Sequence, residues 1–153
     1  MILFEYKDEI QKLPDNFVQE IINHDTENRS WFKDDNYKFY RCSEELKSWV
    51  RDNVKLSFGK IGIQEMWNDI QPHKDPNRNY ALNYLIKTGD ADLCYYTSNS
   101  FYKRGTYISL DKCKEIARFK PEPFRWHIIS TSYLHAVVGV TFQRISLTID
   151  LND

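Results

Sequence analysis

The sequence predicts a mainly β protein with helices at its N-terminus. From Lys55 onward, short segments rich in β-branched and aromatic residues follow one another, separated by turn residues. Before Lys55, two stretches place apolar residues at the three- and four-residue spacing of an amphipathic helix. Strands at this density, with no long helices between them, are typical of an antiparallel sandwich or barrel.

Two helices are predicted in the first third of the chain. The first begins after Pro14, because proline is tolerated in the first turn of a helix. The second begins at Ser43, a residue type favoured at the N-cap, and two glutamates follow in its first turn. The apolar faces consist of Phe17, Ile21 and His24 in the first helix and Leu46, Trp49, Val50 and Val54 in the second. We expect both helices to cover a sheet.

The strand pattern starts with KLSFGKIGIQEMW, in which alternate residues point to one side. Further strand-like segments are YALNYLI, DLCYY, TYISL, FRWHII and QRISLTI, whereas LDKCKEIARF is predicted to form a helical turn between two strands. No repeat, low-complexity tract or linker interrupts the pattern. We therefore predict one domain over residues 1–153, with a helical covering layer over residues 1–54 and a β core over residues 55–153.

Composition limits the classes of partner and the cellular setting. The chain has 153 residues, with 21 basic and 22 acidic side chains and no long run of either sign. This balance predicts neither nucleic acid nor an anionic membrane as a partner. The N-terminus lacks the pattern of an export signal, and no window has the 18 apolar residues of a membrane span. Three cysteines without paired spacing favour reduced thiols, so we expect a cytoplasmic protein.

A short motif within QPHKDPNRNYALNYLI suggests a metal site. His73 and Asp75 are two residues apart, so on an extended backbone their side chains leave on the same face and can converge on one ion. The alternative is a histidine hydrogen-bonded to a loop carboxylate. Three further histidines are present, at positions 24, 127 and 135. A catalytic mononuclear site needs one more ligand, which leaves His127 and His135, because His24 lies on the covering helix.

The sequence after His135 favours this histidine over His127. Gly139 marks a reversal of the chain, which can bring Arg144 back toward the metal end of the same cavity. Arg144 and Ser146 point to one face, where an arginine fork and a hydroxyl can hold a carboxylate. A buried arginine without a partner is strongly disfavoured. The alternative for Arg144 is an exposed strand residue with a solvated guanidinium.

The order His73-x-Asp75, His135, then Arg144 nine residues later with Ser146 following resembles the iron(II)- and 2-oxoglutarate-dependent dioxygenases. The prolyl 4-hydroxylase-like branch of that superfamily is the most similar. The resemblance covers residues 61–150, whereas residues 1–54 match by no motif. It implies a double-stranded β-helix, that is, a cupin-like jelly-roll barrel, in agreement with the mainly β pattern.

The resemblance also implies roles for individual residues. His73, Asp75 and His135 would bind Fe(II), Arg144 and Ser146 would hold the far carboxylate of 2-oxoglutarate, and O2 would complete the set, with ascorbate as a candidate reductant. The implied reaction hydroxylates a peptide residue, such as proline, or a small molecule, and releases succinate and CO2. Asp75 favours hydroxylation over halogenation, because related halogenases have a small residue at that position. The alternative is a non-catalytic jelly-roll protein that binds metal or senses 2-oxoglutarate.

Several neighbouring residues have two possible roles. Tyr84 would bind the far carboxylate of the co-substrate or be a core aromatic, and strand alternation allows only one of Tyr84 and Asn83 to enter the cavity, for which we predict Tyr84. Arg78 would contact the substrate or the metal-bearing loop or, as we favour, be a solvated turn residue. His127 is expected to be a strand residue with an ordinary hydrogen bond. Residues 26–41 and 97–107 are candidate lid loops, and neither has a motif that identifies the substrate.

Overall fold

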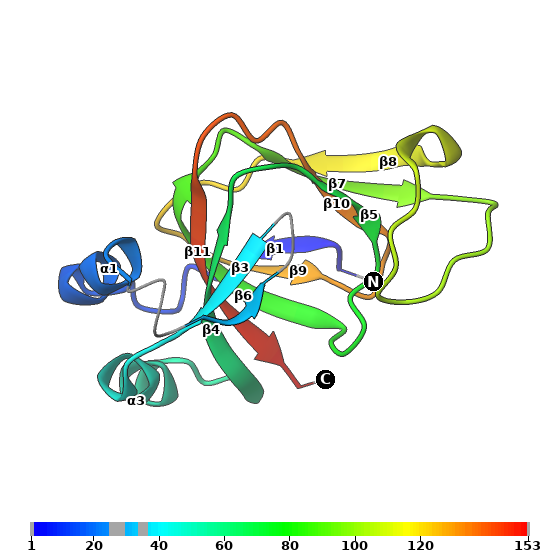
Figure 1. The fold of residues 1–153 in the computed structure, drawn as a ribbon. Helices are drawn as coiled ribbons and strands as arrows, with labels where there is room; N and C mark the ends of the chain where they lie inside the picture. The colour runs from blue at the N-terminus through cyan, green and yellow to red at the C-terminus, as the bar shows by residue number, and fades with distance from the viewer. Residues whose placement is uncertain (1, 25–29, 34–36, 153) are drawn as a thin grey trace.

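Two antiparallel sheets face each other in the computed structural model, which describes residues 2–24, 30–33 and 37–152 (Figure 1). The strands are β1 (Phe4–Tyr6), β2 (Ser30–Lys33), β3 (Tyr37–Arg41), β4 (Phe58–Met66), β5 (Ile70–His73), β6 (Tyr80–Thr88), β7 (Asp92–Thr97), β8 (Lys114–Phe119), β9 (Trp126–Ser130), β10 (His135–Val138) and β11 (Arg144–Leu151). The larger sheet has the order β1-β9-β6-β11-β4-β3-β2, and the smaller has the order β5-β10-β7-β8.

The connectivity of β4 to β11 is that of a jelly roll. The four strands β4, β11, β6 and β9 are neighbours in the larger sheet, and β5, β10, β7 and β8 form the smaller one. The chain passes between the two sheets at β4–β5, β5–β6, β6–β7, β8–β9, β9–β10 and β10–β11. This order of eight strands is a pair of Greek keys folded into two facing sheets. The predicted cupin-like jelly-roll fold is confirmed.

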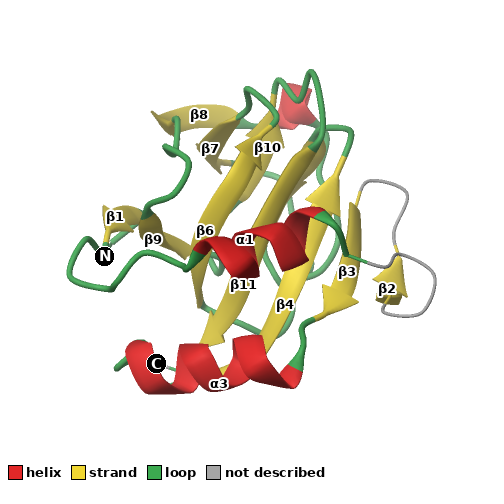
Figure 2. Ribbon diagram, turned by 90° about the vertical axis from the view of Figure 1, so that its left-hand side faces the viewer, coloured by secondary structure: helices red, strands yellow, loops and turns green. Residues whose placement is uncertain are grey.

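Two helices, α1 (Asp15–Ile22) and α3 (Glu44–Asn53), lie across the outer face of the larger sheet (Figure 2). The N-cap predicted at Ser43 is present, because its hydroxyl accepts a hydrogen bond from the backbone N–H of Leu46 at 3.1 Å. Pro14 precedes the first turn of α1 as predicted. Val18, Ile21, Leu46 and Val50 are the buried helix residues. Both predicted covering helices are therefore confirmed.

The principal apolar core lies between these helices and the larger sheet. Helix residues pack there against side chains from the outer face, including Ile63, Leu82 and Leu147. Along β4 the neighbouring residues Gly62 and Gln64 instead face the space between the two sheets. In most sandwiches the apolar core lies between the two sheets. Here the helices provide that core on the outside, which leaves room for a cavity inside.

The first 54 residues contain more strand than predicted. Besides the helices they supply β1, which pairs with β9, and β3, which pairs with β4, while β2 pairs with β3. The predicted helical covering layer therefore accounts for only part of residues 1–54. The candidate lid over residues 26–41 includes all of β2 and β3, and its residues 26–29 and 34–36 lie outside the described part. Alternation in YKFYR is a strand signal, but five residues are too few to stand out from loop sequence.

Two smaller predictions are corrected in part. The segment LDKCKEIARF forms a single 3₁₀ turn, Leu110–Lys112, and continues as strand β8. The segment TYISL contributes an isolated bridge between Tyr107 and His73 instead of a strand. The reversal at Gly139 is confirmed, since its φ of +88° is accessible mainly to glycine. Within the described residues, no helix is both long and apolar enough to cross a bilayer.

Candidate metal and ligand site

Three side chains from two separate segments meet at one end of the space between the sheets. His73 is the last residue of β5, Asp75 lies in the loop that follows, and His135 begins β10. Antiparallel pairing of β5 with β10 sets His73 directly opposite His135. Nε2 of His73 lies 3.1 Å, and Nε2 of His135 lies 3.4 Å, from Oδ1 of Asp75. The fold thus brings together the three residues that were predicted as a group from the sequence.

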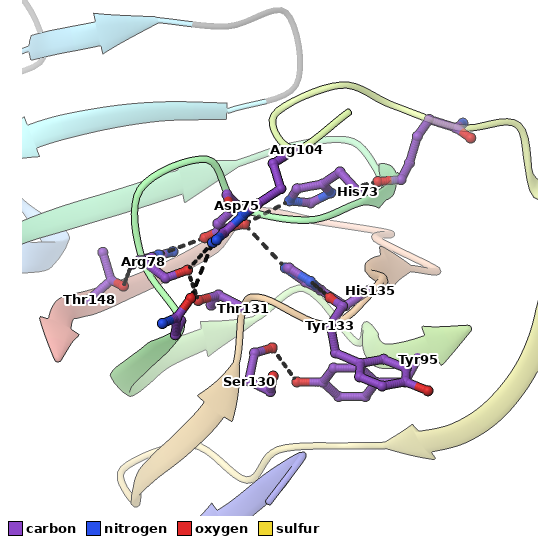
Figure 3. Close-up of polar contacts among 12 residues, drawn as sticks. His73, Asp75, Arg78, Tyr95, Arg104, Ser130, Thr131, Tyr133, His135 and Thr148 are labelled. Atoms are coloured by element: carbon purple, nitrogen blue, oxygen red, sulfur yellow. Dashed lines mark hydrogen bonds and ion pairs between the residues drawn. The ribbon is translucent and has the colours of Figure 1, made fainter. Parts of the chain in front are cut away.

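Both imidazole rings are held by backbone carbonyls (Figure 3). Nδ1 of His73 lies 2.7 Å from the carbonyl oxygen of Gln71, and Nδ1 of His135 lies 2.7 Å from that of Tyr133. Because a carbonyl only accepts hydrogen bonds, Nδ1 must carry the hydrogen in each ring. In a neutral ring Nε2 then keeps a lone pair that can bind a metal, whereas in a protonated ring Nε2 carries a second hydrogen and donates it to Asp75. Such bonds fix the tautomer and orientation of metal-binding histidines.

The spacing of the three ligand atoms fits one divalent ion. Two ligand atoms about 2.1 Å from an ion lie about 3.0 Å apart at a right angle and about 3.4 Å apart at the tetrahedral angle. The two measured distances to Oδ1 of Asp75 fall in this range, and all three ligand atoms lie within 4.8 Å of one another. The group could therefore hold a metal with little rearrangement.

Arg78 fixes the carboxylate of Asp75 from the other side (Figure 3). Its Nε donates to Oδ2 of Asp75 at 2.6 Å, and its Nη1 donates to Oγ1 of Thr148 and to Oδ1 of Asp150. Burial alone would raise the pKa of the Asp75 carboxyl. The bonds from His135 and His73 and the charge of Arg78 outweigh burial and hold this pKa well below its usual range. The favoured prediction of a solvated turn arginine is wrong, and the alternative contact with the metal-bearing loop is correct.

Replacing Arg78 with glutamine is expected to weaken divalent metal binding roughly 10- to 100-fold, the usual cost of losing a group that orients a ligand. Without the guanidinium, Asp75 loses the bond that holds Oδ1 toward the two histidines. Calorimetric titration with Mn(II) measures the effect. The matched control is Arg118→Gln on β8, an exposed arginine that pairs with Glu115 and Asp92. Equal losses in the two variants would contradict the role of Arg78.

A cavity of about 380 Å³ extends from the three ligand residues between the sheets. This volume lies within the roughly 300–1,000 Å³ of typical small-molecule sites. The larger sheet lines the cavity with polar side chains, namely Lys60, Gln64, Asn83, His127, Arg144, Ser146 and Thr148. Apolar lining residues include Met66 from the larger sheet and Ile70, Leu93 and Val137 from the smaller sheet. The metal-ligand group therefore opens onto a chamber that can hold a small polar molecule.

Arg144 and Ser146 line this cavity, as predicted from their spacing. Both are buried, and among the described residues Arg144 makes one hydrogen bond, from Nη1 to the carbonyl oxygen of Thr88 at 2.7 Å. Burial lowers the pKa of the guanidinium to about 10, only partly opposed by the charge of Asp92. Gly89 packs closely against Arg144. A Cβ added at position 89 would lie only 3.0 Å from Cβ of Arg144, so a larger residue would crowd the arginine. Arg144 is thus a charged side chain inside the protein that forms no ion pair with a carboxylate of residues 2–24, 30–33 or 37–152.

Tyr84 does not enter the cavity, which corrects its predicted role at the co-substrate. Its side chain is 1% exposed and packs in the helix-covered core, with its ring centroid 4.8 Å from that of Trp126. Asn83 faces the cavity instead. Alternation in β6 was predicted correctly, but the two faces were exchanged. The large aromatic side chain buries more apolar surface under the helices than it would in a polar chamber.

His127 also lines the cavity, although the prediction gave it no functional part. Its Nδ1 lies 3.2 Å from the carbonyl oxygen of Arg125, which is the ordinary hydrogen bond that was predicted. The ring also stacks on Phe4, with centroids 5.2 Å apart. Burial, helped by the charge of Arg144, outweighs the bond to Arg125 and lowers the pKa of His127 to about 4. His127 is therefore neutral at pH 7.

The lowered pKa of His127 predicts a loss of stability in mild acid. The pKa of His127 is 6.5 in the unfolded chain and about 4 in the folded protein. Between pH 6.5 and pH 4, His127 is therefore protonated in the unfolded chain but neutral in the folded protein. The free energy of unfolding should therefore fall as pH decreases through this window, by about 3 kcal/mol at most. Urea unfolding of the metal-free protein at several pH values measures this. His127→Gln should flatten the curve above pH 4, and an unchanged curve would contradict the assignment.

The segment before η1 (Leu110–Lys112) is tied to the metal-bearing loop. The backbone N–H of Gly105 donates to the carbonyl oxygen of Lys74 at 2.8 Å, and that of Ile108 donates to Pro72 at 2.9 Å. Nε of Arg104 donates to the carbonyl oxygen of Asp75 at 2.8 Å. Residues 104–108 of this connection, which includes the predicted lid over residues 97–107, therefore brace the site from one side.

No protein-family model and no curated protein matches this sequence. Solved structures with partial overlap include a point mutant of Bacillus subtilis oxalate decarboxylase OxdC, with 13% identity, a TM-score of 0.43 and coverage of 79% of this chain and 27% of that one. A cupin superfamily protein from Desulfitobacterium hafniense DCB-2 has 12% identity, a TM-score of 0.37 and coverage of 97% and 99%. Momordica charantia 7S globulin has 11% identity, a TM-score of 0.32 and coverage of 99% and 35%.

The chain thus spans about a quarter of the length of the oxalate decarboxylase and about a third of that of the globulin. Overlaps of this quality carry no argument about activity. The strand order identifies the fold, and the residues of the site determine which chemistry is possible.

Proposed function

We propose that this chain is an iron(II)- and 2-oxoglutarate-dependent dioxygenase. In this proposal His73, Asp75 and His135 hold iron, and Arg144 holds the far carboxylate of 2-oxoglutarate. The products are a hydroxylated substrate, succinate and CO2. One observation supports it above all others: three convergent metal-ligand atoms line the same cavity as a buried arginine that has no carboxylate partner among the described residues.

The ligand set supports a catalytic metal over a structural one. Two imidazole nitrogens and one carboxylate are the donors of the mononuclear iron oxygenases, and they leave coordination positions open for other molecules. A structural zinc site is usually closed by four protein ligands. When bound, iron(II) supplies the reaction with O2 that amino acid side chains cannot carry out. The protein orients the ligands through Gln71, Tyr133 and Arg78.

The buried arginine supports a carboxylate co-substrate. An isolated charge in an apolar interior costs several kcal/mol unless a partner neutralises it. The guanidinium of Arg144 presents a planar fork that suits a carboxylate, and the hydroxyl of Ser146, which faces the same cavity, can add a hydrogen bond. A site that only stored metal would have no use for this charge. A dicarboxylic acid can reach the metal with one end and the arginine with the other.

The substrate is proposed only as a class, a peptide residue such as proline or a small molecule. Tyr37 and Phe39 from β3 and Tyr107 from the braced segment are aromatic residues that line the cavity. Aromatic surfaces of this kind can pack against a proline ring or another apolar group. Ascorbate is the proposed reductant that would keep the metal in its iron(II) state.

Stepwise addition of ligands tests this function. Under anaerobic conditions, iron(II) followed by 2-oxoglutarate should give a weak visible charge-transfer band, and admission of O2 should produce succinate. A band without succinate, also in the presence of candidate peptides, would support the sensing alternative. Absence of both the band and calorimetric binding of 2-oxoglutarate would overturn the proposal.

A further inference from the structure

A row of polar side chains crosses the cavity face of the larger sheet beside the metal-ligand group. Asn83 on β6 is directly opposite His127 on β9 and directly opposite Thr148 on β11. All three line the cavity. Because residues directly opposite in antiparallel strands have Cβ atoms about 5 Å apart, the three side chains form one continuous row.

This row is level with the metal ligands and not with Arg144. Thr148 accepts a hydrogen bond from Nη1 of Arg78 at 3.1 Å, and Nε of the same guanidinium donates to Asp75 at 2.6 Å. Arg144 lies four residues earlier on β11, which is about 13 Å along the strand. A molecule that reached from the metal to Arg144 would therefore pass Asn83 near its metal-proximal end.

Asn83 differs from its neighbours because its amide oxygen has no hydrogen-bond partner. Within the described residues, Oδ1 of Asn83 is buried without any such partner. Thr148 is bonded to Arg78, His127 to Arg125 and Arg144 to Thr88. A buried amide oxygen that lacks a hydrogen bond is destabilising, so native structures rarely retain one without a reason. A bound ligand that engages the amide would supply one.

We propose that Asn83 binds the 2-oxo acid end of the co-substrate, while Arg144 holds the opposite carboxylate. This inference rests on the proposed function and adds to it the residue that recognises the reacting end. The carboxylate and keto oxygens at that end only accept hydrogen bonds, and the amide NH2 of Asn83 can donate to them. A half-turn of the amide exchanges its nitrogen and oxygen, so either edge of the side chain can present the donor.

The test compares two ligands that differ at the far end. 2-Oxoglutarate has two carboxylates, whereas 2-oxobutyrate has the same 2-oxo acid end and no second carboxylate. Affinities are measured by calorimetry on the Mn(II)-loaded protein, which does not turn over. Asn83→Leu and Asn83→Ser should each weaken both ligands by a similar factor, about threefold to tenfold, the effect of one neutral hydrogen bond. Arg144→Met should weaken only 2-oxoglutarate.

Tyr84→Phe is the matched control, because Tyr84 neighbours Asn83 on β6 but faces the helices. It should leave both affinities unchanged, and Mn(II) affinity should be unchanged in the Asn83 variants if the fold is intact. If the Asn83 variants bound both ligands as tightly as the wild type, or lost affinity only for 2-oxoglutarate, the inference would be overturned. If the wild type bound neither ligand, the proposed function itself would fail.

Discussion

Replacing His135 with alanine is expected to abolish iron-dependent formation of succinate. Nε2 of His135 lies 3.4 Å from Oδ1 of Asp75, and Nδ1 is fixed by the carbonyl oxygen of Tyr133. The variant retains two ligand side chains, which cannot hold iron at a defined position. Because loss of an outer orienting group alone costs 10- to 100-fold in metal affinity, loss of a ligand should cost at least about 100-fold. Calorimetry with Mn(II) and a succinate assay measure the two effects.

The matched control for this variant is His24→Gln. His24 is also buried, but it lies beyond α1 on the helix-covered side, where its ring packs 4.2 Å from that of Tyr40. This variant should retain metal affinity and succinate formation, with a change in stability no larger than the ordinary cost of a buried substitution. Wild-type levels of succinate from the His135 variant would refute the metal assignment.

Replacing Arg144 with methionine is expected to have opposite effects on binding and on stability. A buried charge that loses its partner group costs about 2–5 kcal/mol, so affinity for 2-oxoglutarate should fall by roughly 30-fold or more. Without ligand, the guanidinium is buried and has no carboxylate partner among the described residues. Replacing even a buried ion pair with apolar side chains of similar size is often neutral or stabilising by about 1–4 kcal/mol, and an unpaired charge has no partner to offset the cost of its burial. The ligand-free variant should therefore unfold at higher urea concentration.

Lys87→Met on β6 controls for the loss of a positive charge near the same strands. Lys87 is exposed and donates to Gln143 at 3.1 Å, so the substitution should change neither 2-oxoglutarate affinity nor stability appreciably. Metal affinity of the Arg144 variant should equal that of the wild type, because the guanidinium makes no contact with the ligand residues. If the Arg144 variant bound 2-oxoglutarate like the wild type, the carboxylate would have to bind elsewhere.

The parts of the site predicted from sequence are those set by local geometry. His73 and Asp75 share a direction because they are two residues apart, and the reversal at Gly139 returns the chain to Arg144. The choice between Asn83 and Tyr84 depended on something else. Alternation shows that they face opposite ways, but which face meets the helices is decided by the packing of the whole sheet. Since the principal apolar core of this protein lies between the helices and the larger sheet, the tyrosine packs in that core and the asparagine enters the cavity.

Contacts between distant segments escaped prediction for a related reason. Arg78 meets Asp150, 72 positions away in the sequence, and only the folded sheet makes that pair visible. Strand β1 is three residues long and pairs with β9 near the other end of the chain. A segment of this length is too short to show a periodic pattern, and it becomes a strand because it pairs with the edge of the sheet at β9.

Residues 104–108, which brace the metal-bearing loop, leave little room for substitution. Gly105 has a φ of +84°, and a Cβ there would lie 3.2 Å from Cβ of Pro76. Substitutions in this stretch are therefore constrained by the metal-bearing loop next to it, whatever molecule the cavity binds. New selectivity would have to arise on the opposite rim, where Tyr37 and Phe39 line the chamber. Directed evolution for altered selectivity should accordingly randomise β3 and leave residues 104–108 untouched.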